Sequence, residues 1–104
     1  MDRYRMVITS TAKQDIIDIG DYISNILLEP DTSRRFVKGL RHSISQLQYF
    51  PNKFPIVKDT FLARKCIRCM PYKNYYAFYV VSENSKLVTI LRVGYNRRNW
   101  KNIL

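Results

Sequence analysis

Acidic residues, histidine and glycine are all scarce in this sequence, and each shortage excludes a class of function. Its 104 residues include eight Asp or Glu against eighteen Lys or Arg, a single histidine and three glycines. Metal-dependent hydrolysis needs carboxylates or histidines that converge on one ion, and phosphate-binding loops need closely spaced glycines. His42 alone also gives no convincing Ser-His-Asp set. We therefore expect neither a metal nor a cofactor.

Long apolar segments are missing as well. No apolar run approaches the roughly 18 residues of a membrane-spanning helix, and the opening MDRYRMVITS lacks the apolar stretch of a signal peptide. A length of 104 residues suits one domain, and an apolar share of 46% is enough for that domain to form one core. We expect that domain to be cytoplasmic and to have no membrane partner.

The two cysteines, Cys66 and Cys69, form a CxxC motif that invites a redox or zinc interpretation. In a strand, side chains three residues apart point to opposite faces and their backbones lie about 10 Å apart. A disulfide needs Cα atoms within about 7 Å. There is no second CxxC, so a tetrahedral zinc site would lack ligands. We expect two structural thiols.

Positive charge is concentrated in the second half of the chain. Residues 1–63 hold nine Lys or Arg and seven Asp or Glu, which gives +2, whereas residues 64–104 hold nine Lys or Arg against Glu83 alone, which gives +8. This asymmetry indicates a polyanionic partner, either nucleic acid or an acidic protein, in preference to a generic basic surface.

The first half of the sequence predicts a strand followed by two helices. Residues 4–9 alternate as in a strand, and Thr11 with Gln14 fits a capping box at the start of a helix that ends near Glu29-Pro30. A second helix begins around 31–33 and ends at the prolines of FPNKFP, so the two form an antiparallel hairpin. The apolar stripes of the two helices are Ala12, Ile16, Ile19, Ile23, Ile26 and Leu27, and Phe36, Val37, Leu40, Ile44 and Leu47.

The second half predicts strands. The predicted strands are ARKCIRCM (63–70), NYYAFYVV (74–81) and KLVTILRVGY (86–95), with turns at 71–74 and 82–85. The last two are rich in β-branched and aromatic residues. NRRNWKNIL (96–104) predicts a short helix capped by Asn96, with Trp100, Ile103 and Leu104 anchoring it on the core. The fold class is therefore α+β: an N-terminal strand, a helical hairpin packed on a mainly antiparallel four-stranded sheet, and a short C-terminal helix.

The candidate chemistry is carried by arginine, lysine and tyrosine. Arg68 and Arg92 each interrupt an apolar strand, and a charge there needs a partner or an open face. A cluster of guanidinium groups near Arg97 and Arg98 would favour a phosphate. Arg92 could instead pair with an acid of the first helix, and Arg97 could act as a local cap.

Other polar and aromatic residues leave alternatives open. Asp15, Asp18 and Asp21 fit a solvated helix face or a docking face for a basic partner. His42 is expected on the exposed side of the second helix. The aromatic residues of the central strands could pack in the core or stack on bases; they are Tyr72, Tyr75, Tyr76, Phe78 and Tyr79.

Taken in order, these segments resemble the RelE/ParE toxin superfamily of type II toxin–antitoxin systems. The resemblance covers nearly the whole chain: the opening strand, the helix with its early Ala12 and IGDYI, the segment ISQLQYFPNKFP, the basic strand with Arg68, the tyrosine-flanked NYYAFYVV, and the closing VTILRVGYNRRNW. It implies a growth-arresting toxin whose partner is a cognate antitoxin, acidic and from the same operon. The superfamily also includes toxins that stabilise plasmids.

The resemblance implies two alternative targets, and the first is the one that we expect. One is mRNA on the ribosome, which RelE-type members cleave without metal by attack of the RNA 2′-hydroxyl; Arg68, Tyr95, Arg97 and Arg98 would then be catalytic. Nucleic acid would also contact Arg64, Lys65, Lys73, Arg92 and Lys101. The other target is DNA gyrase, which ParE-like members inhibit without an active site. Tyr76 stands where the nucleases carry an arginine, and their C-terminal catalytic tyrosine has no match. A plain nucleic-acid-binding module is a third reading.

Overall fold

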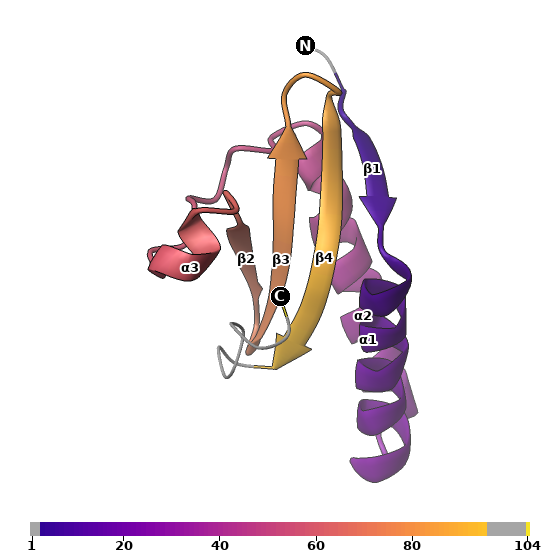
Figure 1. The fold of residues 1–104 in the computed structure, drawn as a ribbon. Helices are drawn as coiled ribbons and strands as arrows, with labels where there is room; N and C mark the ends of the chain where they lie inside the picture. The colour runs from indigo at the N-terminus through magenta and orange to yellow at the C-terminus, as the bar shows by residue number, and fades with distance from the viewer. Residues whose placement is uncertain (1–2, 96–103) are drawn as a thin grey trace.

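Two helices cover one face of a four-stranded sheet in the computed structural model, which describes residues 3–95 and Leu104 (Figure 1). The strands are β1 (Arg5–Ile8), β2 (Arg68–Tyr72), β3 (Tyr75–Ser82) and β4 (Leu87–Tyr95), in the spatial order β1-β4-β3-β2. β1 pairs with β4 in parallel, and the other pairs are antiparallel. This confirms the predicted α+β class, while the helix predicted for 96–104 lies outside the described residues except for Leu104.

Helix α1 (Ser10–Asp21) is capped by Thr9, two residues before the predicted cap. The Thr9 hydroxyl accepts a hydrogen bond from the Ala12 amide at 3.0 Å and donates one to the Leu91 carbonyl at 3.0 Å. One side chain therefore starts the helix and fixes it to β4, which the local Thr11–Gln14 pattern could not reveal. The helix continues into a π-helical turn, η1 (Tyr22–Ile26).

Helix α2 (Pro30–Ser45) returns antiparallel to α1, begins with Pro30 in its first turn and leads into a 3₁₀ turn, η2 (Gln46–Gln48). Proline fits that position because the first amides of a helix have no intrahelical partner. The apolar faces of both helices pack on one face of the sheet and form the main core, as their spacing predicts. Its buried residues are Ala12, Ile16, Ile23, Phe36, Leu40, Ile44, Leu47, Met70, Ala77, Tyr79, Val88, Ile90 and Val93.

The strand predicted for residues 63–70 is wrong in its first half. Asp59 caps a short helix, α3 (Thr60–Ala63), by accepting a hydrogen bond from the Leu62 amide at 3.2 Å. A turn follows in which Cys66 has φ 57°, and β2 begins only at Arg68. Arg64 and Cys66 therefore do not share a strand face with Arg68.

The opposite face of the sheet carries a smaller apolar cluster made of Leu62, Ile67, Cys69 and Phe78, on which Leu104 packs. Leu104 thus contacts the core as predicted, whereas Trp100 and Ile103 lie outside the described residues. Cys66 is exposed and Cys69 is buried, and neither is in a disulfide bond. The turn predicted at 71–74 is shorter in the structure. β2 ends at Tyr72 and β3 begins at Tyr75, so only Lys73 and Asn74 connect the two strands. Within the described part of the chain, no helix is both long and apolar enough to cross a membrane.

Candidate functional site

Arg68 lies at the start of the edge strand β2, half-buried on the helix-facing side of the sheet. Its Nη1 donates to the Phe54 carbonyl at 2.6 Å, and its strand partner is Tyr79. The Tyr79 hydroxyl donates to the Pro51 carbonyl at 2.9 Å. Arg68 and Tyr79 together hold the loop at 51–54 against the sheet.

Tyr79 is fully buried, and burial raises its pKa to about 12, with a smaller opposing effect from Arg68. A phenol in this environment stays protonated at neutral pH and lies away from solvent. Tyr79 is therefore a structural group in the core, which agrees with strand packing as the expected role of this aromatic residue.

Arg92 forms an ion pair with an acid of the first helix, one of the two expectations for it. Its Nε and Nη2 contact the two carboxylate oxygens of Asp15 at 2.8 and 3.0 Å. The hydrogen bond that Arg92 donates to Asp15 also raises the pKa of Arg92, so the guanidinium stays charged. Asp15 additionally accepts from the Val93 amide at 3.0 Å. The Asp15 carboxylate is thus half-buried and hydrogen-bonded to β4, in contrast to the solvated position expected for it.

Tyr95 lies far from Arg68 along the sheet. It ends β4, is 56% exposed and packs edge-to-face on Tyr75 with ring centroids 5.3 Å apart. Arg68 pairs with Tyr79 and Tyr95 pairs with Tyr75, so the two positions are four residues apart along β3. That offset is about 13 Å along the strand. The structure does not bring these two catalytic candidates together.

The remaining cationic candidates are also spread over the molecule. Arg64 and Lys65 are exposed in the turn after α3, where Lys65 Nζ lies 4.7 Å from the centre of the Phe61 ring and donates to the Leu104 carbonyl at 3.3 Å. Lys73 is at the turn between β2 and β3, at the far end of β2. Arg97, Arg98 and Lys101 lie outside the described residues. Within the described part of the chain, no three His, Cys, Asp or Glu side chains are placed to hold a metal ion.

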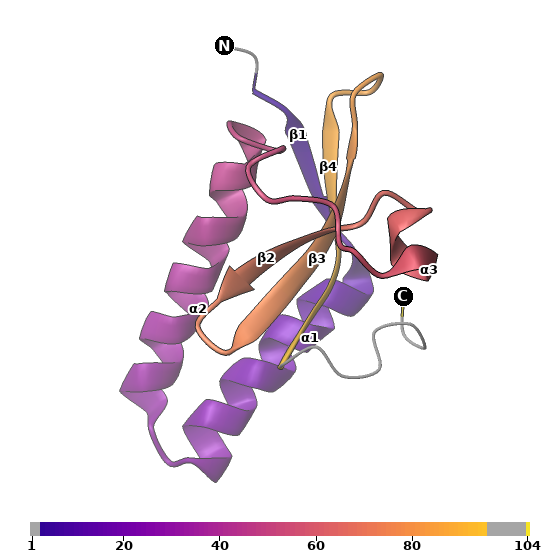
Figure 2. The same ribbon diagram turned by 90° about the vertical axis from the view of Figure 1, so that its left-hand side faces the viewer.

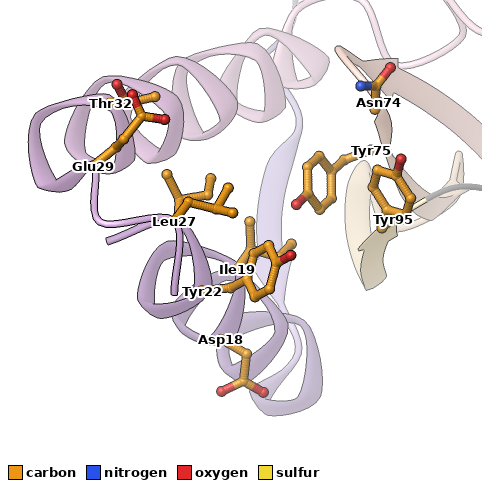
Figure 3. A pocket seen from close by; sticks show the side chains of 10 residues that line it. Asp18, Ile19, Tyr22, Leu27, Glu29, Thr32, Asn74, Tyr75 and Tyr95 are labelled. Atoms are coloured by element: carbon orange, nitrogen blue, oxygen red, sulfur yellow. The ribbon is translucent and has the colours of Figure 1, made fainter. Parts of the chain in front are cut away.

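A groove of about 700 Å³ opens between the tip of the helical hairpin and the end of the sheet. Figure 3 shows Ile19, Tyr22 and Leu27 on the helical side and Tyr75 and Tyr95 across from them. Its lining is mainly apolar and aromatic, with carboxylates and small polar groups at the rim. The lining residues are Asp18, Ile19, Tyr22, Ile23, Leu27, Glu29, Thr32, Asn74, Tyr75 and Tyr95.

The groove exists because the hairpin extends beyond the end of the sheet (Figures 1 and 2). Ile26 and Leu27, predicted as part of the buried stripe, are 68% and 48% exposed, and the adjacent Leu28 is 78% exposed with φ 56°. A leucine in the left-handed region is uncommon and costs free energy. Exposed apolar side chains beside an aromatic groove indicate a site for a protein partner.

This groove was missed by the sequence reasoning, although one signal for it is present. Residues 26–28 are three consecutive apolar residues just before Glu29-Pro30, one more than the helical stripe can use. The prediction for Tyr95 is a catalytic role in RNA cleavage, whereas the structure places it in the wall of an apolar groove.

The fold is shared with proteins of solved toxin–antitoxin systems. Among solved structures, the fold is similar to the "Chromosomal ParDE TA system from P. aeruginosa", with TM-score 0.74 and 18% identity over 91% of this chain and 98% of that chain. It is also similar to the toxin–antitoxin complex RelBE2 of Mycobacterium tuberculosis, with TM-score 0.68 and 19% identity over 92% and 94% of the two chains.

The sequence also matches the family model for the ParE toxin of the type II toxin–antitoxin system parDE over residues 6–100. The chain belongs to this family of type II toxins. No curated protein matches the sequence.

Proposed function

We propose that this toxin arrests growth by inhibiting DNA gyrase, and that it does so by binding and without an active site of its own. The membership of the ParE family supports this target. The positions of the described cationic candidates support it further, because Arg68, Arg92 and Lys73 lie at separate places on the fold. We place its action in the cytoplasm, where gyrase works.

The chemistry of metal-free RNA cleavage explains why the spread of cations matters. Attack by a 2′-hydroxyl needs several positive groups around one phosphate and a group that accepts a proton. The Arg68 guanidinium donates to Phe54, the Arg92 guanidinium is bound to Asp15, and the raised pKa of buried Tyr79 makes it a poor base. On β3 a tyrosine, Tyr76, stands where the nucleases have arginine.

Ribosome-dependent mRNA cleavage is the second candidate, and one observation favours it. Tyr95 is 56% exposed, and Arg97 and Arg98 follow it by two and three residues in the sequence. An exposed phenol could stack on a base, and arginines so near to it in sequence suit the adjacent phosphate.

Two assays with the purified toxin separate these targets. With gyrase and relaxed plasmid we expect supercoiling to stop and cleaved DNA to accumulate. In a reconstituted translation reaction we expect primer extension to find intact mRNA. New 5′ ends at A-site codons, lost in Arg98→Ala and in Arg68→Ala, together with normal supercoiling would overturn the gyrase proposal in favour of the nuclease.

We also propose an acidic antitoxin, encoded in the same operon, as the neutralising partner. The +8 charge of residues 64–104 supports an acidic segment lying across the sheet. The groove at the hairpin tip supports a second, apolar contact, because an exposed cavity lined by Tyr22, Leu27, Tyr75 and Tyr95 suits buried side chains of a partner.

A further inference from the structure

The outward face of α2 is a continuous row of basic side chains. At 100° per residue these positions fall within an arc of about 120°, and the buried positions of the helix fall on the opposite side. All five basic residues are exposed: Arg34, Arg35, Lys38, Arg41 and His42. Figure 2 shows α2 running along one side of the molecule.

Little negative charge offsets this row. Asp31 pairs with Arg34 at the start of the helix, and Asp21 of α1 borders the shallow groove that Arg34 and Arg41 also line. Arg35 makes only a long contact, 3.4 Å, to the Thr32 hydroxyl. Within residues 3–95 and 104, neither Lys38 nor Arg41 has an ion-pair partner.

The kind of polyanion follows from what the face does not contain. No large apolar side chain of α2 is exposed, although α1 and η1 expose several. Protein interfaces need buried apolar anchors, membrane-surface helices need an apolar face, and single-stranded nucleic acid needs aromatic stacking platforms. A row of basic side chains without apolar or aromatic neighbours suits the phosphates of duplex DNA, because these are negatively charged and regularly spaced along a stiff double helix.

The dimensions agree with a duplex. Arg34 and His42 are eight residues apart, about 12 Å along the helix axis. One strand of B-DNA has a phosphate about every 3.4 Å of axis, so this length spans about three to four phosphates. We propose that the outward face of α2 binds the backbone of duplex DNA, without reading its sequence.

This binding goes beyond the proposed function, because it is a property of the toxin with DNA alone. Its relevance to the proposed target is direct, since gyrase acts on duplex DNA and a toxin docked on gyrase lies close to it. A toxin that binds DNA but leaves supercoiling unchanged would contradict the gyrase proposal only. A toxin that inhibits gyrase but does not bind free duplex would contradict this one only.

The test is fluorescence anisotropy of a labelled duplex of about 20 base pairs, titrated with the full chain between about 50 and 200 mM salt. The variant is Arg35→Gln/Lys38→Gln/Arg41→Gln, which leaves the Arg34–Asp31 pair in place. The matched control is Lys13→Gln/Lys53→Gln/Lys58→Gln, which removes the same charge from exposed positions outside α2. Glutamine is a good helix former, and circular dichroism checks that both variants fold.

Each lost phosphate contact lowers the slope of log affinity against log salt by about 0.9, so the α2 variant is expected to lower it by about 2.7. The control variant is expected to keep the slope of the unmodified chain. Equal losses in both variants would show that net charge alone binds DNA and would overturn the proposal. So would unchanged binding by the α2 variant, or tighter binding of a single-stranded oligonucleotide of the same length.

Discussion

Asp15 is the residue that joins the first helix to the last strand. β1 ends opposite Ile90, so β4 continues beyond it with an unpaired edge. Asp15 fills that place by accepting from the Val93 amide and from the Arg92 guanidinium. Both side chains of the ion pair are largely covered, at 14% and 26% exposure, so the solvent screens the pair weakly.

We expect Asp15→Ala to lower the free energy of unfolding by about 2–3 kcal/mol, because it leaves Arg92 and the Val93 amide without their acceptor. Urea denaturation measures the change. Asp21→Ala, at an exposed position of the same helix, is expected to change stability by no more than about 0.5 kcal/mol. Equal effects of the two substitutions would show that Asp15 has no special role in the junction.

The raised pKa of Tyr79 leads us to expect a loss of stability at high pH. Its pKa is about 12 in the folded protein and close to 10 when the chain is unfolded. Because the folded pKa is raised, the stabilisation is complete below pH 10 and is lost as the pH rises toward 12. At most about 2.7 kcal/mol is involved, since one pKa unit corresponds to about 1.36 kcal/mol.

Absorbance titration of tyrosinate and unfolding curves between about pH 9 and 12 test this expectation. Tyr79→Phe is expected to remove one late-titrating phenol and to flatten the fall in stability above pH 10. The variant also loses the hydrogen bond to the Pro51 carbonyl, so it is expected to be less stable by about 1–3 kcal/mol at neutral pH. An unchanged titration curve would mean that Tyr79 is not the buried phenol.

At the scale of elements, α2 and β2 are in close contact where Gly39 meets Tyr72. A Cβ added at Gly39 would overlap the Tyr72 hydroxyl and would lie 3.2 Å from its Cζ. The Tyr72 ring is itself held edge-on against Phe36, with centroids 5.2 Å apart. Glycine is therefore needed for close packing here and not for a special backbone conformation.

Gly39→Ala is expected to cost about 1–3 kcal/mol of unfolding free energy, as overpacking does. In a Tyr72→Phe background the hydroxyl is absent, so the same substitution is expected to be neutral or stabilising by up to about 1 kcal/mol from the better helix propensity of alanine. The four stabilities form a double-mutant cycle measured by thermal or urea unfolding. Additive effects would contradict the proposed contact.

The elements that the sequence predicted correctly are those whose apolar pattern continues over many residues. The second helix shows its apolar residues at three-and-four spacing from Phe36 to Leu47, about three turns. β3 and β4 show β-branched and aromatic runs, so both the type and the buried face of these elements could be assigned. α3 was missed because Thr60–Ala63 is a single helical turn, too short to show a period, and its main sequence signal is the cap at Asp59.

The candidate site was less predictable, since its contacts are tertiary. The sequence allowed an acid of the first helix as partner for Arg92, and Asp15 is that acid. It gave no sign that Arg68 would bind the Phe54 carbonyl, because the path of the loop depends on the whole fold. The groove depends on how far the hairpin extends beyond the sheet, which periodicity cannot tell: Ile26 and Leu27 continue the apolar stripe but have nothing to cover them.

At the scale of the whole molecule, two surfaces are available to the proposed antitoxin: the cationic second half, with +8 over residues 64–104, and the apolar groove at the hairpin tip. Long-range charge attraction acts mainly on the rate of association, whereas contacts made after docking act mainly on the rate of dissociation. The two surfaces are therefore expected to affect different rate constants.

We expect the association rate constant of toxin and antitoxin to fall by roughly tenfold or more as salt is raised, with a much smaller change in dissociation. Leu27→Asp, in the groove, is expected to speed dissociation by about 10-fold to 100-fold, because burying one leucine contributes about 1.5–3 kcal/mol. Ile17→Asp is the control, since Ile17 is also a half-exposed apolar residue of the hairpin but lies outside that groove. Biolayer interferometry over a salt series measures both constants. If Ile17→Asp and Leu27→Asp were equally harmful, or if Leu27→Asp slowed association alone, the apolar contact would lie elsewhere, and the unusual backbone of Leu28 would need another explanation.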